Sequence, residues 1–114
     1  MAEMVSYEDF KKLDIRIGKI VEAENVPKSR ALVKLIVDIG EDQPRQIIAG
    51  ISQYYKPEDL LNRKIVVLAN LQPRKMMGLD SQGMLLAADI NHKPFLLKIP
   101  DEAEDKVKPG TKVT

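Results

Sequence analysis

The stretch from Asp14 to Val26 constrains the fold more than any other part of the chain. Ile15 and Ile17 alternate with polar residues, which is the period-two pattern of a strand with one buried face, whereas Ile20 falls out of phase with them. A phase slip near Gly18 predicts a β-bulge that bends a long strand from one wall of a sheet toward another. A small, strongly curved barrel needs such a bend in its first strand.

The rest of the chain is typical of short strands separated by turns. Apolar residues alternate or run together in brief segments bounded by Gly, Pro, Asn and Asp. We expect further strands at 32–39, 46–49, 64–70, 84–88, 95–99 and 111–113. Ser6 predicts the cap of a short helix that ends near Lys12. A second short helix is expected at 57–61, where Pro57 occupies the first turn.

These elements predict an all-β fold. Five or more short strands, a helical piece between the third and fourth, and a bulge in the first are typical of the OB-fold, a five-stranded Greek-key barrel. Another small barrel or a sandwich fits the same pattern. The 114 residues suit one domain, with the barrel at about 13–90 and a C-terminal extension at 91–114.

Composition excludes several kinds of chemistry. The chain has no cysteine, which removes disulfides, thiolate metal sites and cysteine nucleophiles. His92 is the single histidine and lies in an expected turn, and no set of nucleophile, base and orienting group is visible. We expect no catalytic residues, no cofactor and no metal, so the chain is not predicted to be an enzyme. It shows no signal peptide or membrane-length apolar run, which favours the cytoplasm.

Net charge leaves the partner open, because 18 basic residues nearly cancel 17 acidic ones and partners respond to local charge. By strand alternation we expect Arg16 and Lys34 to point outward from the first and second strands. In an OB barrel, the first three strands and the loop between the fourth and fifth form one binding surface. Cations that would lie on it are Arg16, Lys34, Arg45, Arg74 and Lys75. The alternative is that they are ordinary solubilising charges.

Methionine and aromatic usage bear on how a nucleic acid would be bound. Met76 and Met77 lie in the loop between the fourth and fifth strands, and Met84 opens the fifth. Methionine usually fills gaps in a core, but one beside an exposed groove can contact an unstacked base. Only two Phe and three Tyr are present, whereas single-strand binders usually stack bases on aromatic side chains. This predicts recognition of RNA by shape and backbone.

Four blocks of the chain, in order, carry a family resemblance. They are Asp14–Ile20 (DIRIGKI), Val37–Gly40 (VDIG), Arg45–Ile51 (RQIIAGI) and Asn70–Ala88 (NLQPRKMMGLDSQGMLLAA). Together they resemble the tRNA-binding domains of methionyl-tRNA synthetases, which occur as a C-terminal domain or a separate beta subunit. The same signature occurs in free-standing, structure-specific tRNA-binding proteins.

The resemblance implies an OB-fold that binds tRNA by shape, at the outer corner of the L, with little sequence preference. Matched position by position, it implies tRNA contacts at Arg16, Lys34, Asn70, Arg74, Lys75, Ser81 and Met84. One departure concerns the turn after the first strand. The family often has a lysine where this chain has Ala31, so Lys28 or Arg30 would have to replace that contact.

The resemblance also implies partners. Family members are typically homodimers that use segments outside the barrel, for which residues 91–114 are available here. The methionyl-tRNA synthetase catalytic chain would be a further partner. Two alternatives stay open at this point. A related dimeric OB family comprises peptide-binding secretion chaperones, and a third possibility is a protein-assembly module for synthetases.

Overall fold

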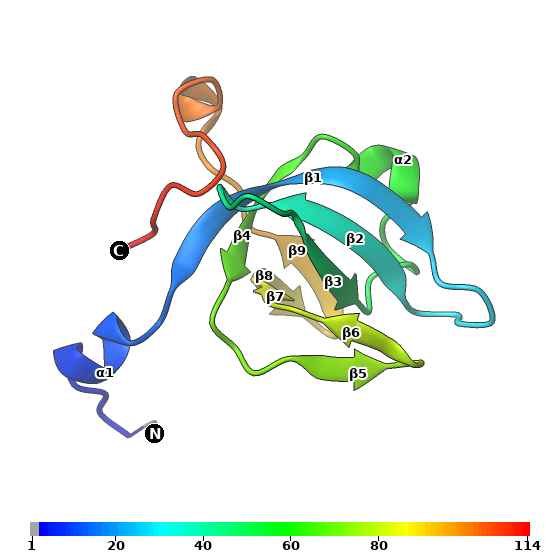
Figure 1. Cartoon of the computed structure of the whole chain (residues 1–114), viewed down its shortest axis with the longest axis horizontal. Coiled ribbons are helices and arrows are strands. Elements are labelled where there is room, and N and C mark those ends of the chain that lie inside the picture. Colours follow the sequence, from blue (N-terminus) through cyan, green and yellow to red (C-terminus); the bar gives the residue numbers. More distant parts are fainter. Residues whose placement is uncertain (1–2) are drawn as a thin grey trace.

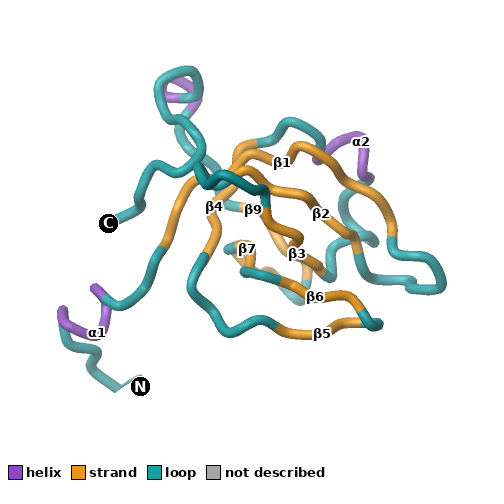
Figure 2. Tube along the Cα trace, in the orientation of Figure 1, coloured by secondary structure: helices purple, strands orange, loops and turns teal. Residues whose placement is uncertain are grey.

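The computed structural model describes residues 3–114, and most of the described chain is strand and turn. The elements in chain order are α1 (Tyr7–Lys11), β1 (Ile15–Asn25), β2 (Val33–Asp38), β3 (Arg45–Ala49), α2 (Pro57–Leu60), β4 (Lys64–Leu68), β5 (Arg74–Met76), β6 (Leu79–Ser81), β7 (Met84–Leu85), β8 (Ala87–Ile90), β9 (Lys93–Leu96) and the 3-10 helix η1 (Asp101–Ala103). The helices are short and lie at the edges of the strands (Figure 2). The predicted all-β class is confirmed.

Five antiparallel strands form the main sheet in the order β3-β2-β1-β4-β7. The sheet curls until its far edge meets the β5–β6 hairpin (Figure 1). There the Gln82 amide donates to the Gln46 carbonyl at 2.8 Å, and the Ile48 amide donates to Ser81 Oγ at 3.0 Å. These bonds nearly close the sheet into a barrel, so the predicted OB-type architecture is confirmed.

The bulge in β1 is real, but it is not at Gly18. The β1–β2 register shifts between Ile20 and Glu22, so Val21 is the extra residue. Gly18 instead faces the crowded core, where a Cβ would lie 2.7 Å from Val37 Cγ1. Gly18 is therefore needed for the close packing of β1 against β2. The bulge lies further along the strand, at Val21.

Three expected strands differ from those in the structure. The loop expected after β4 contains a hairpin of its own, β5–β6, which turns at Met77 and Gly78 with positive φ at both. The strand expected at 84–88 breaks at Leu86 into β7 and β8, and the strand expected at 95–99 begins earlier, as β9. The strand expected at 111–113 forms only an isolated bridge between Lys112 and Arg16.

The C-terminal segment lies along β1. The Ile17 amide donates to the Thr111 carbonyl at 2.8 Å, and the Gly110 amide donates back to the Ile17 carbonyl at 2.7 Å. These bonds place the segment beside β1 in the plane of the sheet, and Ile17 is buried although it does not belong to the main core cluster. Both predicted helices are present, and Ser6 Oγ caps α1 by accepting from the Asp9 amide.

Candidate nucleic-acid interface

Lys34 and Arg74 lie in one row across four strands. Lys34 pairs with Ile48 across β2 and β3. The Ile48 amide is bonded to Ser81 on β6, and Ser81 pairs with Arg74 across the hairpin. We call Lys34, Ile48, Ser81 and Arg74 the cation row. The row links Lys34 on β2 to Arg74 on β5 by way of the edge of β3 and the Ser81 hydroxyl.

Lys34 points outward, as its alternation with buried Val33 and Leu35 predicted. Its ammonium pairs with Glu24 at 2.8 Å, and this contact raises the pKa of Lys34. Glu22 also lies near it on the outer face of β1. The pair is solvent-exposed, so it contributes little to stability, and an RNA phosphate can replace the carboxylate.

The adjacent cations Arg74 and Lys75 point to opposite faces of the hairpin, as successive residues of a strand must. Lys75 is paired across the strands with Asp80 and forms an exposed ion pair with it at 3.6 Å. The Arg74 guanidinium makes no hydrogen bond or ion pair with any residue in the described part of the chain. Arg74 is therefore available to an incoming anion without first breaking a contact.

Arg16 does not point outward as expected. It pairs with Val67, a core residue, so its side chain starts on the inner face of β1 at one end of the barrel. There its guanidinium binds both Asp14 oxygens at 2.9 Å and reaches the Ile39 carbonyl. The bidentate hydrogen bonding from Arg16 lowers the pKa of the Asp14 carboxyl. Ile17 and Gly18 are both buried although they lie on opposite faces of β1, so the burial of Ile17 does not mark the face that meets the core.

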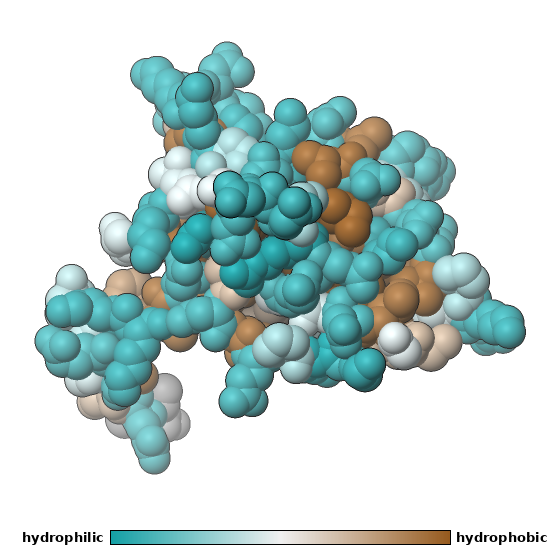
Figure 3. Space-filling model, viewed as in Figure 1, coloured by the Kyte–Doolittle hydropathy of each residue, from teal (hydrophilic) through white to brown (hydrophobic). Residues whose placement is uncertain are grey.

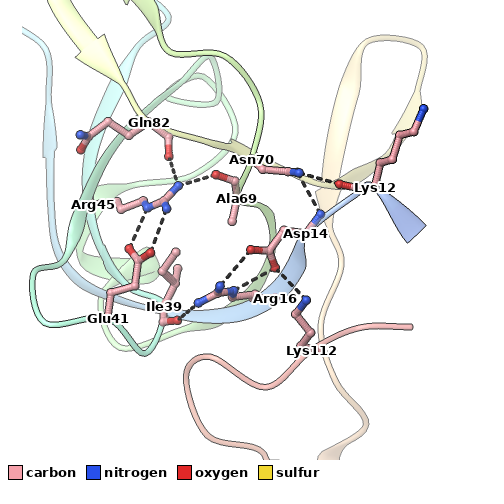
Figure 4. A network of polar contacts seen from close by, with 10 residues as sticks. All are labelled: Lys12, Asp14, Arg16, Ile39, Glu41, Arg45, Ala69, Asn70, Gln82 and Lys112. Carbon is pink, nitrogen blue, oxygen red and sulfur yellow. Dashed lines mark hydrogen bonds and ion pairs between the residues drawn. The ribbon is translucent and has the colours of Figure 1, made fainter. Parts of the chain in front are cut away.

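Arg45 and Asn70 belong to the same polar network, shown in Figure 4. Arg45 pairs with Glu41 at 2.9 Å, which lowers the pKa of that carboxyl, and also donates to the Ala69 and Gln82 carbonyls. Asn70 Oδ1 accepts from the Asp14 amide, and its amide group donates to the Lys12 carbonyl. These signature residues connect the start of β1 to the segment after β4.

Ser81 is the one buried polar residue among those described. Its hydroxyl accepts from the Ile48 amide at 3.0 Å and donates to the Gly83 carbonyl at 3.2 Å. The first bond fixes the hairpin to the edge of β3, and the second holds the chain just after β6, so this side chain helps to place the strand that pairs with Arg74.

Beside the hairpin lies a groove of about 230 Å³ with mainly apolar walls. We call it the hairpin groove and define it by Ile51, Leu71, Arg74, Met76, Met84 and Leu96. Met84, for which both a core-filling role and a place beside an exposed groove were open, is 40% exposed and lies on the wall of this groove. Arg74 supplies a positive charge to this otherwise apolar groove.

A second exposed apolar surface was not predicted. The α1 helix buries none of its residues and stands clear of the barrel (Figure 3). Tyr7, Phe10 and Leu13 remain exposed next to Val113 of the C-terminal segment. We call these four residues the terminal patch. Tyr7 and Phe10 at helical spacing after the Ser6 cap were the sequence signal for it.

Other kinds of site are not found in the described chain. Residues 3–114 contain no group of three acidic, histidine or cysteine side chains arranged to hold a metal ion. None of the helices described is long and apolar enough to cross a membrane.

Comparison with known proteins identifies the family. The family model "Putative tRNA binding domain" matches residues 15–112. Methionine–tRNA ligase of Archaeoglobus fulgidus is 53% identical over 111 residues, which are 97% of this chain and 16% of that protein. The Thermotoga maritima ligase is 49% identical over 110 residues, 96% of this chain and 17% of that protein. The chain thus spans about one sixth of the length of these relatives.

Solved structures agree with this assignment. A MetRS-related protein from Pyrococcus horikoshii superposes with a TM-score of 0.88 at 33% identity, covering 99% of this chain and all of that one. The chaperone CsaA from Bacillus anthracis superposes with a TM-score of 0.84, also at 33% identity, covering 98% of this chain and all of that one. The family model covers nearly the whole chain, and the chain belongs to the tRNA-binding domain family.

Proposed function

We propose that this chain is a non-catalytic module that binds tRNA by its shape and backbone. The observation that carries the proposal is the cation row beside an open groove, in a chain of the tRNA-binding domain family. Because its two cations lie on different strands, β2 and β5, we propose that each engages a separate phosphate.

The candidate residues divide into two roles. Lys34, Arg74, Lys75 and Met84 have side chains that RNA can reach, and we propose that they contact it. Arg16, Arg45, Asn70 and Ser81 are engaged within the protein, and we propose that they act by holding the hairpin and the start of β1 in place.

The turn between β1 and β2 supplies a further cation. Ser52 Oγ donates to the Arg30 carbonyl at 3.0 Å, and the Ser52 amide donates to the Ala31 carbonyl. Because these bonds anchor Arg30 next to the end of β3, we propose that Arg30, rather than Lys28, replaces the lysine that the family often has at position 31. Lys28 lies at the turn itself, with φ +69°.

We further propose a homodimer that uses the terminal patch. Tyr7 is 71% exposed and Leu13 45%, on an arm with no buried residue of its own. Exposed apolar surface of this kind is typical of protein interfaces. A second copy would also double the number of cation rows and raise the affinity for one RNA. Sedimentation equilibrium should give twice the monomer mass for the native chain. A Phe10→Glu variant should lower the measured mass toward that of the monomer.

As a part of the cell's aminoacylation machinery, the module would act in the cytoplasm. We propose that it increases the hold of a methionyl-tRNA synthetase on tRNA, either as its C-terminal domain or as a separate beta subunit. The identity of about 50% to methionine–tRNA ligases supports this association. Co-purification with the synthetase catalytic chain tests it, since a module with an unrelated role would not be retained.

A gel-shift assay tests tRNA binding itself. Several unrelated tRNAs should be shifted alike, because the cation row reads the backbone, whereas a DNA duplex of similar length should compete poorly. Failure to shift any tRNA at low salt contradicts the proposal.

A peptide-binding chaperone is the second candidate, favoured by the mainly apolar hairpin groove and by the similarity to CsaA. It predicts binding to an unfolded polypeptide such as reduced, carboxymethylated α-lactalbumin. Binding to that polypeptide without binding to tRNA would favour the chaperone.

A further inference from the structure

The hairpin groove combines two properties that a nucleotide would match. Its walls are mainly apolar side chains, including Leu71, Met76 and Met84. At the same groove lies Arg74, which has no partner among the described residues. An apolar surface next to an unpaired cation suits a ligand that carries a flat apolar ring and an anion side by side.

The size of the groove limits the ring. At about 230 Å³ it is smaller than the drug-sized sites that begin near 300 Å³. One base, with one or two fused rings, suits such a space, whereas a longer folded ligand does not. Thioether side chains adapt to flat surfaces of varying outline, so Met76 and Met84 can pack against different bases.

The polar groups of the groove do not select one base. The Ser81 hydroxyl donates its one hydrogen to the Gly83 carbonyl and accepts from the Ile48 amide, so it has no donor left for a base. Gln72, on the exposed segment before β5, is the remaining uncharged polar side chain on the wall. With few donors and acceptors facing it, a base would be held by packing and not by reading of its edges.

From this we propose that the hairpin groove holds one unstacked nucleobase of a bound RNA while Arg74 pairs with the adjoining phosphate. This inference rests on the proposed RNA binding and adds a ligand to it. A base within a continuous helix cannot enter, so the groove would favour folded RNAs that extrude one. A peptide is less well matched, since the cation row offers a second positive charge, on Lys34, for which a backbone of repeated phosphates is suited.

Gly50 provides the variant that tests the groove. It lies on the wall, and a Cβ built there meets nothing within 4 Å. A Gly50→Leu side chain would occupy the open space without displacing the core, and Gly50→Ala is the matched control that leaves most of the space free. Arg74→Ala should weaken binding of any RNA through the phosphate contact alone.

Two RNA hairpins with the same stem serve as probes, one with a single bulged 2-aminopurine and one fully paired. We expect the native chain to bind the bulged RNA about fivefold more tightly, the low end for one stacked base. Gly50→Leu should abolish that preference and leave the affinity for the paired hairpin unchanged, whereas Gly50→Ala should keep it. Equal affinities in the native chain, or a preference that survives Gly50→Leu, would overturn the proposal.

A measurement on the native chain makes the test independent of any variant. The ¹³C-methyl resonance of Met84 should shift when the bulged hairpin binds and stay in place with the paired one. If unfolded α-lactalbumin shifts this methyl and the bulged RNA does not, the groove is a peptide site and the inference fails. If neither hairpin binds, RNA binding itself is refuted, and that outcome is distinct from equal binding of both.

Discussion

Replacing Ser81 with alanine should destabilise the fold without removing a contact to tRNA. The substitution deletes the acceptor of the Ile48 amide and the donor to the Gly83 carbonyl, at a side chain that is only 5% exposed. An unsatisfied buried donor costs roughly 1–3 kcal/mol. We therefore expect a loss of about 2 kcal/mol in the free energy of unfolding, or about 8 °C in Tm for a domain of this size.

Urea denaturation measures this loss, with Ser52→Ala as the matched control. The Ser52 hydroxyl donates to the Arg30 carbonyl near the surface, where water can replace it, so its removal should cost less than about 1 kcal/mol. Under conditions where Ser81→Ala remains folded, the salt dependence of tRNA binding should match that of the native chain. Native stability combined with weakened tRNA binding would refute the structural role and make Ser81 a contact residue.

Three further predictions concern separate parts of the fold. Gly18→Ala places a Cβ 2.7 Å from Val37 Cγ1 and should destabilise by roughly 1–3 kcal/mol in urea denaturation, whereas a neutral result would show that β2 yields. Met77→Asn, at φ +54° in a two-residue turn, should raise Tm by a few degrees without changing tRNA affinity. Arg16 lowers the pKa of Asp14, so this carboxylate stabilises the fold above its unfolded pKa near 4 and loses that effect as pH falls through the lower folded value. In Asp14→Asn, the free energy of unfolding should therefore fall less steeply with decreasing pH below about pH 4 than in the native chain. The same pH dependence in both proteins would contradict the network.

The sequence determines the strands through local patterning, but not the surfaces that two distant segments create together. Val33, Leu35 and Val37 alternate strictly, and β2 lies where that period predicts. Ile17 follows the same rule in β1 and is buried, yet the core cluster faces Arg16 and Gly18 on the other side of the strand. The direction inferred for Arg16 was therefore wrong, because a period of two does not say which of two buried faces meets the core.

In the candidate site, too, local sequence predicted some features and missed others. Arg74 and Lys75 are adjacent in sequence, and a loop would have let both face one ligand. The hairpin instead points them to opposite faces, where they would contact different parts of a bound RNA. Its turn lacks the usual signal because Met77 occupies a position that Asn or Gly normally takes. Asn91 marks the equivalent turn between β8 and β9, which was predicted.

The salt dependence of tRNA affinity in a Lys34→Ala, Arg74→Ala double variant tests the cation row most directly. If Arg30, Lys34, Arg74 and Lys75 each neutralise one phosphate, the native chain should show a log–log slope of about −3, or roughly a fiftyfold loss between 50 and 200 mM salt. Removing two of the cations should reduce the slope by about two. A slope equal to that of the native chain, with the variant folded, would contradict the account.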